Sequence, residues 1–176
     1  MNKPKFRAWD KNDKKMIDWE YLINYCDIDY LFGGYDGGFG KEGPKSYEYP
    51  IPMQYTGLKG YMDEAFNDPE EKEVAQGDVI DIFWEEWPAG YYQENHMIGV
   101  VDWDDTGTAW VIRNGKFDWD NPTPIPNEID GMSISRSLPD EEDLEEVFLH
   151  NFNLTSDDIT ILGNIHENPE LLNEVE

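Results

Sequence analysis

The chain has 176 residues, 39% hydrophobic and 14% aromatic, and its formal net charge is −26. This length and aromatic content predict one compact unit with a packed core, and they exclude a wholly disordered acidic chain. The charge argues against direct nucleic-acid binding, because affinity for phosphate backbones depends on Lys and Arg. A single cysteine, Cys26, excludes an intrachain disulfide framework and is expected to be a small buried residue.

The first residues are basic, but no apolar run follows them, so no signal peptide is predicted. No stretch approaches the ~20 apolar residues that a membrane span needs. We therefore expect a soluble, cytoplasmic protein.

The acidic residues are concentrated in the last two thirds of the chain. Residues 1–60 carry nine Lys and Arg against nine Asp and Glu, a net charge of zero. Residues 61–116 carry three against fourteen, a net of −11, and residues 117–176 carry only Arg136 against sixteen, a net of −15. This distribution favours a partner with a basic face, since complementary fields speed encounter and select orientation. The alternative is that the acidity serves solubility alone.

In chain order, KFRAWD (5–10) and MIDW (16–19) are predicted to pair as a β-hairpin across the polar turn KNDKK. Residues 32–50 hold six Gly and two Pro, which is typical of a loop or an insertion. They contain no GxGxxG, so they do not predict a dinucleotide site. MQYTGLKG (53–60) is expected to be a strand that ends in a Thr-Gly turn, and residues 61–76 an acidic connector with at most one helical turn.

The clearest strand signal begins at Gly77. In GDVIDIFW, Ile80, Ile82 and Trp84 alternate with other side chains and should lie on one face. GVVDWDD (99–105) and TAWVIRNG (108–115) are predicted to form a hairpin, and ITILGNI (159–165) a further strand. Short strands separated by turn signals predict a mainly β fold, as a small antiparallel barrel or rolled sheet.

Two helices are expected. In residues 137–152, Leu144, Val147 and Phe148 have helical spacing, and acids at 140–143 suit the positive end of a helix dipole. A short C-terminal helix should begin at Pro169, with Asn168 as its N-cap.

Two sequence fragments imitate catalytic or metal-binding motifs incompletely. His166 and Glu167 begin an HExxH motif, but position 170 is Glu and follows Pro169, so the stretch is predicted to close the fold instead. DWDDTGTAWVIR (102–113) imitates a calcium loop, but Arg113 stands where a bidentate Glu is required. The three histidines, His96, His150 and His166, are far apart in the sequence. We therefore predict no enzyme activity, no catalytic residue, no metal and no cofactor.

The best candidate for a binding surface is the segment EEWPAGYYQENHM (85–97). Its aromatic residues Trp87, Tyr91 and Tyr92 lie between two predicted strands, on a loop that also holds Pro and Gly. Aromatic residues on loops often form contact surfaces, because they bury a large area with few rotatable bonds. The alternative is that they cover an open end of a barrel.

Several motifs together resemble the YopX family of phage and prophage proteins: KFRAWD, KKM, MQYTGLK, GDV, GVVDW and ILGNIHENPELL, in this order. The resemblance covers about half of the chain closely. It implies an SH3-like β-barrel core with additions, an origin in a phage or prophage, hence a bacterial host cell, and a tendency to self-assemble. It implies no established activity, and therefore no functional residue. On this basis we expect an N-terminal hairpin and Gly-rich segment (1–60), an acidic connector (61–76) and an SH3-like barrel with helical additions (77–176), packed as one unit.

The function expected first is that of a non-enzymatic accessory protein that binds a host or phage protein, as a homo-oligomer. One alternative is an acidic mimic of nucleic acid that blocks a host DNA-binding or defence protein. Another is a protein that sequesters a small molecule in an aromatic pocket.

Overall fold

The computed structural model describes residues 4–26, 50–62, 70–87, 90–117, 128–133 and 145–172. Within these residues the fold is mainly β, as predicted, with one α-helix, α1 (Trp19–Tyr25). The Gly-rich segment lies outside the described residues except for Pro50.

Nine strands form one mixed sheet, in the order β10-β7-β6-β5-β11-β3-β1-β2, with β4 pairing with β3 beside this path. Their bounds are β1 Phe6–Asp10, β2 Lys15–Ile17, β3 Ile51–Met62, β4 Glu71–Ala75, β5 Asp78–Glu86, β6 Gln93–Trp103, β7 Trp110–Phe117, β10 Glu146–Phe148 and β11 Ile159–Asn164. Two further strands, β8 (Glu128–Ile129) and β9 (Met132–Ser133), pair only with each other. The large sheet draws strands from both sides of the boundaries expected at residues 60 and 76.

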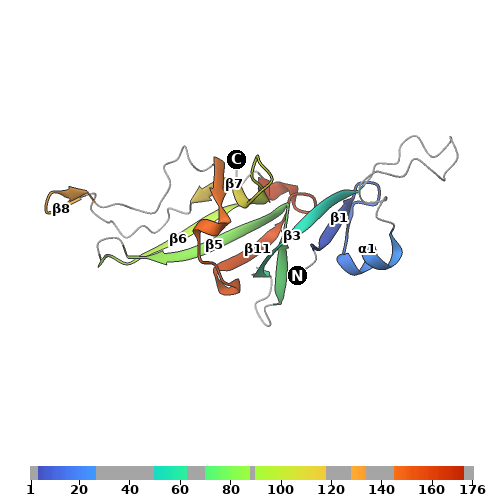
Figure 1. Cartoon of the computed structure of the whole chain (residues 1–176), viewed down its shortest axis with the longest axis horizontal. Helices are drawn as coiled ribbons and strands as arrows, with labels where there is room; N and C mark the ends of the chain where they lie inside the picture. Colours follow the sequence, from blue (N-terminus) through green and yellow to red (C-terminus); the bar gives the residue numbers. More distant parts are fainter. Residues whose placement is uncertain are drawn as a thin grey trace.

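The sheet is open, so the predicted SH3-like barrel is not confirmed. Closure requires the first and last strands of the order to pair. Here one end of the order is β10 and the other is β2, two strands of three residues each, and the chain leaves β2 for α1 at Trp19. Figure 1 shows α1 and β1 at one end of an elongated molecule, and β5 and β6 extending toward the other. The sheet is also not wholly antiparallel, because β11 runs parallel to β3 at Thr160 and Ile161.

The main core lies on one face of the sheet. Ile80, Ile82 and Val101 are fully buried there, as their alternation predicts, and Trp84 packs against this core. The core is completed by buried apolar residues from other strands: Val74, Met97, Ile112, Val147, Leu149, Ile159 and Ile161. Gly99 allows this packing, because a Cβ built on it would lie 2.2 Å from Cγ2 of Ile112.

The N-terminal hairpin is confirmed. Ala8 pairs with Ile17 across β1 and β2, and both pack with Leu22 of α1 in a second, smaller core. Cys26 is only partly buried and packs against this core. The sequence analysis missed α1, although Asp18 signals it: the Asp18 carboxylate accepts a hydrogen bond from the Tyr21 amide at 2.7 Å, as an N-cap does.

Three other predictions about local structure are wrong. Thr56 and Gly57 do not end a strand: they lie at a register shift inside β3, which continues to Met62. Glu71–Ala75, expected in a connector, pairs with β3 as strand β4. In the described part of the predicted amphipathic helix, Glu146–Phe148 forms the strand β10, where Val147 points into the core, and Leu149–Asn151 forms the 3-10 turn η3; Leu144 lies outside the described residues. Three apolar positions are too few to distinguish a helical period from an alternating one, and pairing with β7 decided the outcome.

Candidate functional site

The aromatic residues predicted as a binding surface lie at the tip of the β5–β6 hairpin. The ladder of this hairpin continues to the pair Glu86–Gln93, and Trp87, Tyr91 and Tyr92 follow directly beyond it. Their exposed fractions are 57%, 41% and 40%, respectively, and the rings of Trp87 and Tyr92 contact each other at 5.3 Å. We call these three residues the tip aromatics. Their role in binding stays a prediction.

The Tyr92 hydroxyl holds two carboxylates at the tip. It lies 2.7 Å from Oε1 of Glu85 and 2.5 Å from Oε1 of Glu94. These two hydrogen bonds, that of Glu94 first, raise the pKa of the Tyr92 phenol above its ordinary value. The ring therefore stays neutral at physiological pH and presents an apolar face in a strongly acidic setting.

A groove of about 930 Å³ lies beside the tip aromatics, between the end of β5 and the segment from β10 to η4 (Ser156–Asp158). We call it the acidic groove. Its apolar wall includes Trp84 and Phe152, whose rings contact at 4.9 Å, and Leu154. Among the described residues, the lining contains no Lys, Arg or His and five acidic residues: Glu85, Glu86, Glu145, Glu146 and Asp158. The remaining lining residues are Phe83, Trp87, Val147, Phe148, Asn151 and Asn153.

Sequence analysis missed this groove, because its two walls are more than fifty residues apart in the chain. It also missed an amide pair on the inner face of the same hairpin. Gln93 and Asn95 are 4% and 5% exposed, and the Gln93 amide donates to Oδ1 of Asn95 at 2.7 Å. The core face of β6 thus becomes polar toward the tip, which ends the hydrophobic core there.

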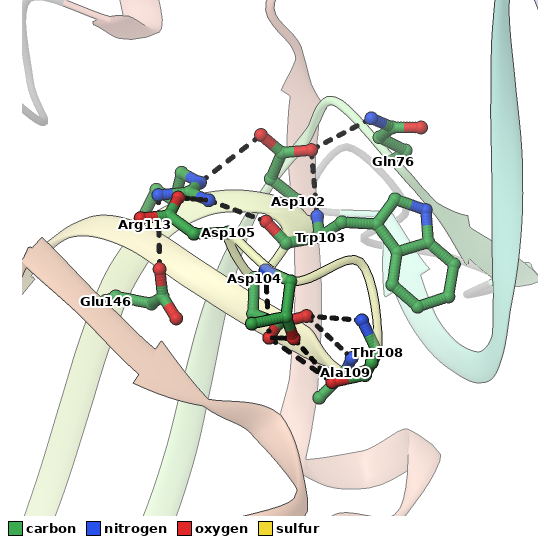
Figure 2. Close-up of polar contacts among 10 residues, drawn as sticks. Gln76, Asp102, Trp103, Asp104, Asp105, Thr108, Ala109, Arg113 and Glu146 are labelled. Atoms are coloured by element: carbon green, nitrogen blue, oxygen red, sulfur yellow. Dashed lines mark hydrogen bonds and ion pairs between the residues drawn. The ribbon is translucent and has the colours of Figure 1, made fainter.

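The calcium-like loop is a hairpin turn between β6 and β7, as predicted. Arg113, in β7, provides the positive charge of a cluster of acidic side chains beside this turn. Figure 2 shows the guanidinium among three carboxylates from different parts of the chain. The nitrogen–oxygen distances are 3.3 Å to Asp102, 2.9 Å to Asp105 and 3.2 Å to Glu146, and Arg113 also donates to the Trp103 carbonyl at 2.7 Å. Since Glu146 belongs to β10, this cluster fastens the edge strand to the β6–β7 hairpin.

Asp104 organises the turn itself (Figure 2). Its carboxylate accepts hydrogen bonds from the Thr106 hydroxyl and from the Thr108 and Ala109 amides. These bonds, that of Thr106 first, hold the pKa of Asp104 well below its usual range. The carboxylate is thus used to build the turn. In the part of the chain that the structure describes, no group of three or more His, Cys, Asp and Glu is arranged to hold a metal ion.

The histidines remain apart in the fold. His96 lies 3.2 Å from Asp81, and His150 contacts the Phe148 ring. His166 stacks on Trp9, with ring centroids 5.3 Å apart and an angle of 8° between the planes.

The segment ILGNIHENPELL closes the fold. The side-chain oxygen of Asn164 accepts from the amides of His166 and Glu167, and its amide donates to Glu167 at 2.6 Å, so the chain turns sharply after β11. The 3-10 turn η5 (Pro169–Leu171) begins at the predicted proline. Asn168 occupies the N-cap position, as predicted, but its side chain makes no capping hydrogen bond and accepts instead from the backbone amide of Asn164, at 3.3 Å.

The turn after β11 packs against residues of β1 and against the start of β5. We call this cluster the closing junction, and its residues are Arg7, Trp9, Asp78, Asn164 and His166. The Arg7 guanidinium lies 2.5 Å from Asp78, whose second oxygen accepts from the Ala75 amide at 2.8 Å. Asp78 is 2% exposed. Gly77, at φ +79°, lets the backbone turn here and accepts from the Ile165 amide at 2.9 Å.

The geometry defines a class of protein: a mainly β protein with an open mixed sheet, an exposed aromatic hairpin tip and an acidic groove. Compared with known families, residues 5–173 match the model described as YopX protein. The chain therefore belongs to the YopX family, which suggests a phage-associated protein and defines no molecular role. No match was found among curated proteins, and none among solved structures.

Three segments on which the resemblance depends, KFRAWD, GDV and ILGNIHENPELL, supply all five residues of the closing junction. These segments therefore pack together in the fold. In the described residues, no helix is both long enough and apolar enough to cross a membrane.

Proposed function

We propose that this protein is a non-enzymatic accessory protein of a phage or prophage, which acts in the bacterial cytoplasm by binding another protein, as a homo-oligomer. The observation that supports this most is the tip aromatics, three large exposed rings at the end of a projecting hairpin. Aromatic residues of this kind carry much of the binding energy in protein interfaces.

The acidic surroundings of the tip select the kind of partner. Glu85 and Glu94 flank Tyr92, and the acidic groove lies directly behind Trp87. A partner with a basic face would be steered toward this end of the molecule.

The test is an affinity pull-down from host lysate with the double variant Trp87→Ala/Tyr91→Ala, beside light scattering of the protein alone. We expect a loss of ~2 kcal/mol or more in partner binding or self-assembly. The matched control is Tyr21→Ala/Tyr25→Ala, which removes two exposed aromatic rings of α1, 52% and 76% exposed, at the other end of the molecule. Unchanged partners and unchanged assembly in a folded tip variant would refute the proposal.

A second candidate function is mimicry of nucleic acid, which the five carboxylates of the acidic groove favour. A mimic would bind a basic partner that competes with DNA, and salt would release that partner steeply. A binding interface centred on aromatic residues would persist at moderate salt. Pull-downs repeated at increasing NaCl concentration, with and without competitor DNA, separate the two functions.

A further inference from the structure

We propose that the acidic groove is a docking site for an extended peptide segment of the partner in which Lys or Arg alternates with apolar residues. This inference rests on the proposed function and names the chemistry of the partner. The groove combines two properties on one surface: an apolar wall and a lining rich in carboxylates.

The apolar part provides the attachment. Trp84, Phe152 and Leu154 close the end of the main core and also face the groove, so their positions are fixed by packing on one side. Phe83, Trp87 and Phe148 add further apolar lining. A preformed apolar wall of this kind binds aliphatic side chains without first having to be ordered.

The acidic part selects the charge of the occupant. In the part of the chain that the structure describes, the lining holds five carboxylates and no cationic side chain. One of them, Glu146, is paired with Arg113, which approaches it from β7. An acidic segment would add like charges to this lining, whereas Lys or Arg side chains are attracted to it and can also lie against the faces of the Trp and Phe rings.

The same charge argument disfavours the tip of a second copy as the occupant. The tip aromatics of this protein are flanked by Glu85 and Glu94, so a second tip would bring like charges into the groove. The occupant is therefore expected to be a different, basic segment.

The test uses the intact protein and two synthetic peptides of equal length and charge, one alternating Lys with Leu and the other alternating Lys with Ser. Binding is measured by fluorescence anisotropy of the labelled peptides. We expect the Lys/Leu peptide to bind at least ~5-fold more tightly, since only it can use the apolar wall. Equal affinity for the two peptides would mean attraction by net charge alone and would overturn the proposal.

Two groove variants locate the site. Glu145→Lys reverses an exposed charge of the lining and should weaken Lys/Leu binding at least ~5-fold. Phe148→Ala should weaken binding of the Lys/Leu peptide and leave the Lys/Ser peptide unaffected. The matched control is Glu170→Lys, which makes the same charge change at another exposed position, in η5. It should alter affinity less than ~2-fold, because η5 follows Asn164, which pairs with the start of β5, whereas the groove lies at the end of that strand.

Equal effects of Glu145→Lys and Glu170→Lys would overturn the groove as the site. A change in the sedimentation of the protein alone on Glu145→Lys, with peptide binding unchanged, would assign the groove to a second copy and would also overturn the proposal.

Tyr91→Ala separates this inference from the proposed function, because Tyr91 does not line the groove. If the tip variants lose their partners while both peptides bind equally, the proposed function stands and this inference fails. If Glu145→Lys weakens peptide binding while the tip variants keep their partners, the groove stands and the role of the tip fails.

Discussion

Strand β5 begins and ends in opposite environments. At its start, Asp78 is 2% exposed, paired with Arg7 and enclosed by the closing junction. At its end, the chain passes from Glu86 to Trp87, which is 57% exposed beside an acidic groove. At the first end a buried charge has a dedicated partner within the chain. At the second, large aromatic rings face solvent beside carboxylates, and aromatic residues are enriched in protein interfaces.

This comparison assigns stability to one end of the strand and binding to the other. Substitutions at the closing junction should therefore unfold the protein, and substitutions at the tip should leave it folded. The predictions that follow, made on four variants, test this division from the largest expected effect to the smallest.

Arg7→Ala should be the most destabilising of these changes, at ~3–5 kcal/mol, because it leaves the Asp78 carboxylate buried without its countercharge. The measurement is urea unfolding. The control is Lys5→Ala, which removes an exposed pair with Glu73 and should cost at most ~1 kcal/mol. Equal costs for the two variants would contradict a special role for the buried pair.

The same variant should become less destabilised as pH falls. Burial raises the pKa of Asp78 above its ordinary value, and the Arg7 guanidinium opposes that rise. Without Arg7 the native state holds a proton more tightly than the unfolded state does. The stability of the variant should therefore increase as pH falls from neutrality, relative to that of the wild type.

Arg113→Met should cost ~2 kcal/mol, because it removes the charged donor shared by three carboxylates and the Trp103 carbonyl. The loss should be partly restored by NaCl, since salt screens the repulsion among the remaining acids. Thermal melts at low salt and at high salt test this. A variant as stable as the wild type at low salt would show that the cluster in Figure 2 does not fasten β10.

His166→Gln should change stability by less than ~1 kcal/mol at neutral pH and alter its pH dependence. Burial against Trp9, with Arg7 and Lys11 nearby, lowers the pKa of His166. The neutral ring is therefore favoured in the native state. Its contribution is present above the unfolded-state pKa of about 6.5 and is lost as pH falls through the lower native value.

Urea unfolding between neutral pH and about pH 5 should show a smaller loss of stability in His166→Gln than in the wild type. The control is His150→Gln, a histidine outside the closing junction. Loss of a measurable activity in folded His166→Gln would show that the closing junction is a site.

Tyr91→Ala should have the smallest effect, within ~0.5 kcal/mol of the wild type, as expected for an exposed position. The measurement is a thermal melt beside that of Arg7→Ala. A cost of ~3 kcal/mol or more would mean that the tip supports the core, and the comparison between the two ends of β5 would fail.

The sequence determined the features that depend on neighbouring residues. Alternation in GDVIDIFW and ITILGNI predicted which side chains face the core, and the turn chemistry of DDTG predicted the β6–β7 hairpin. Asp, Asn, Pro and Gly act over a few residues, so the hairpin of β1 and β2 and the start of η5 could also be predicted. The sequence also showed that Arg113 stands at the position where a calcium loop requires Glu, so no calcium site was predicted.

Tertiary structure decided the features that depend on distant partners. Val147 and Phe148 have helical spacing with Leu144, yet β7 offered backbone hydrogen bonds and β10 formed. β11 lies between β3 and β5, although more than fifty residues separate it from β5 in the chain. It pairs parallel with β3 and antiparallel with β5, which makes the sheet mixed. The open sheet, the Arg7–Asp78 pair and the acidic groove all join residues far apart in the chain. A local sequence pattern cannot predict these long-range contacts, because they depend on which surfaces are still exposed once the strands have paired.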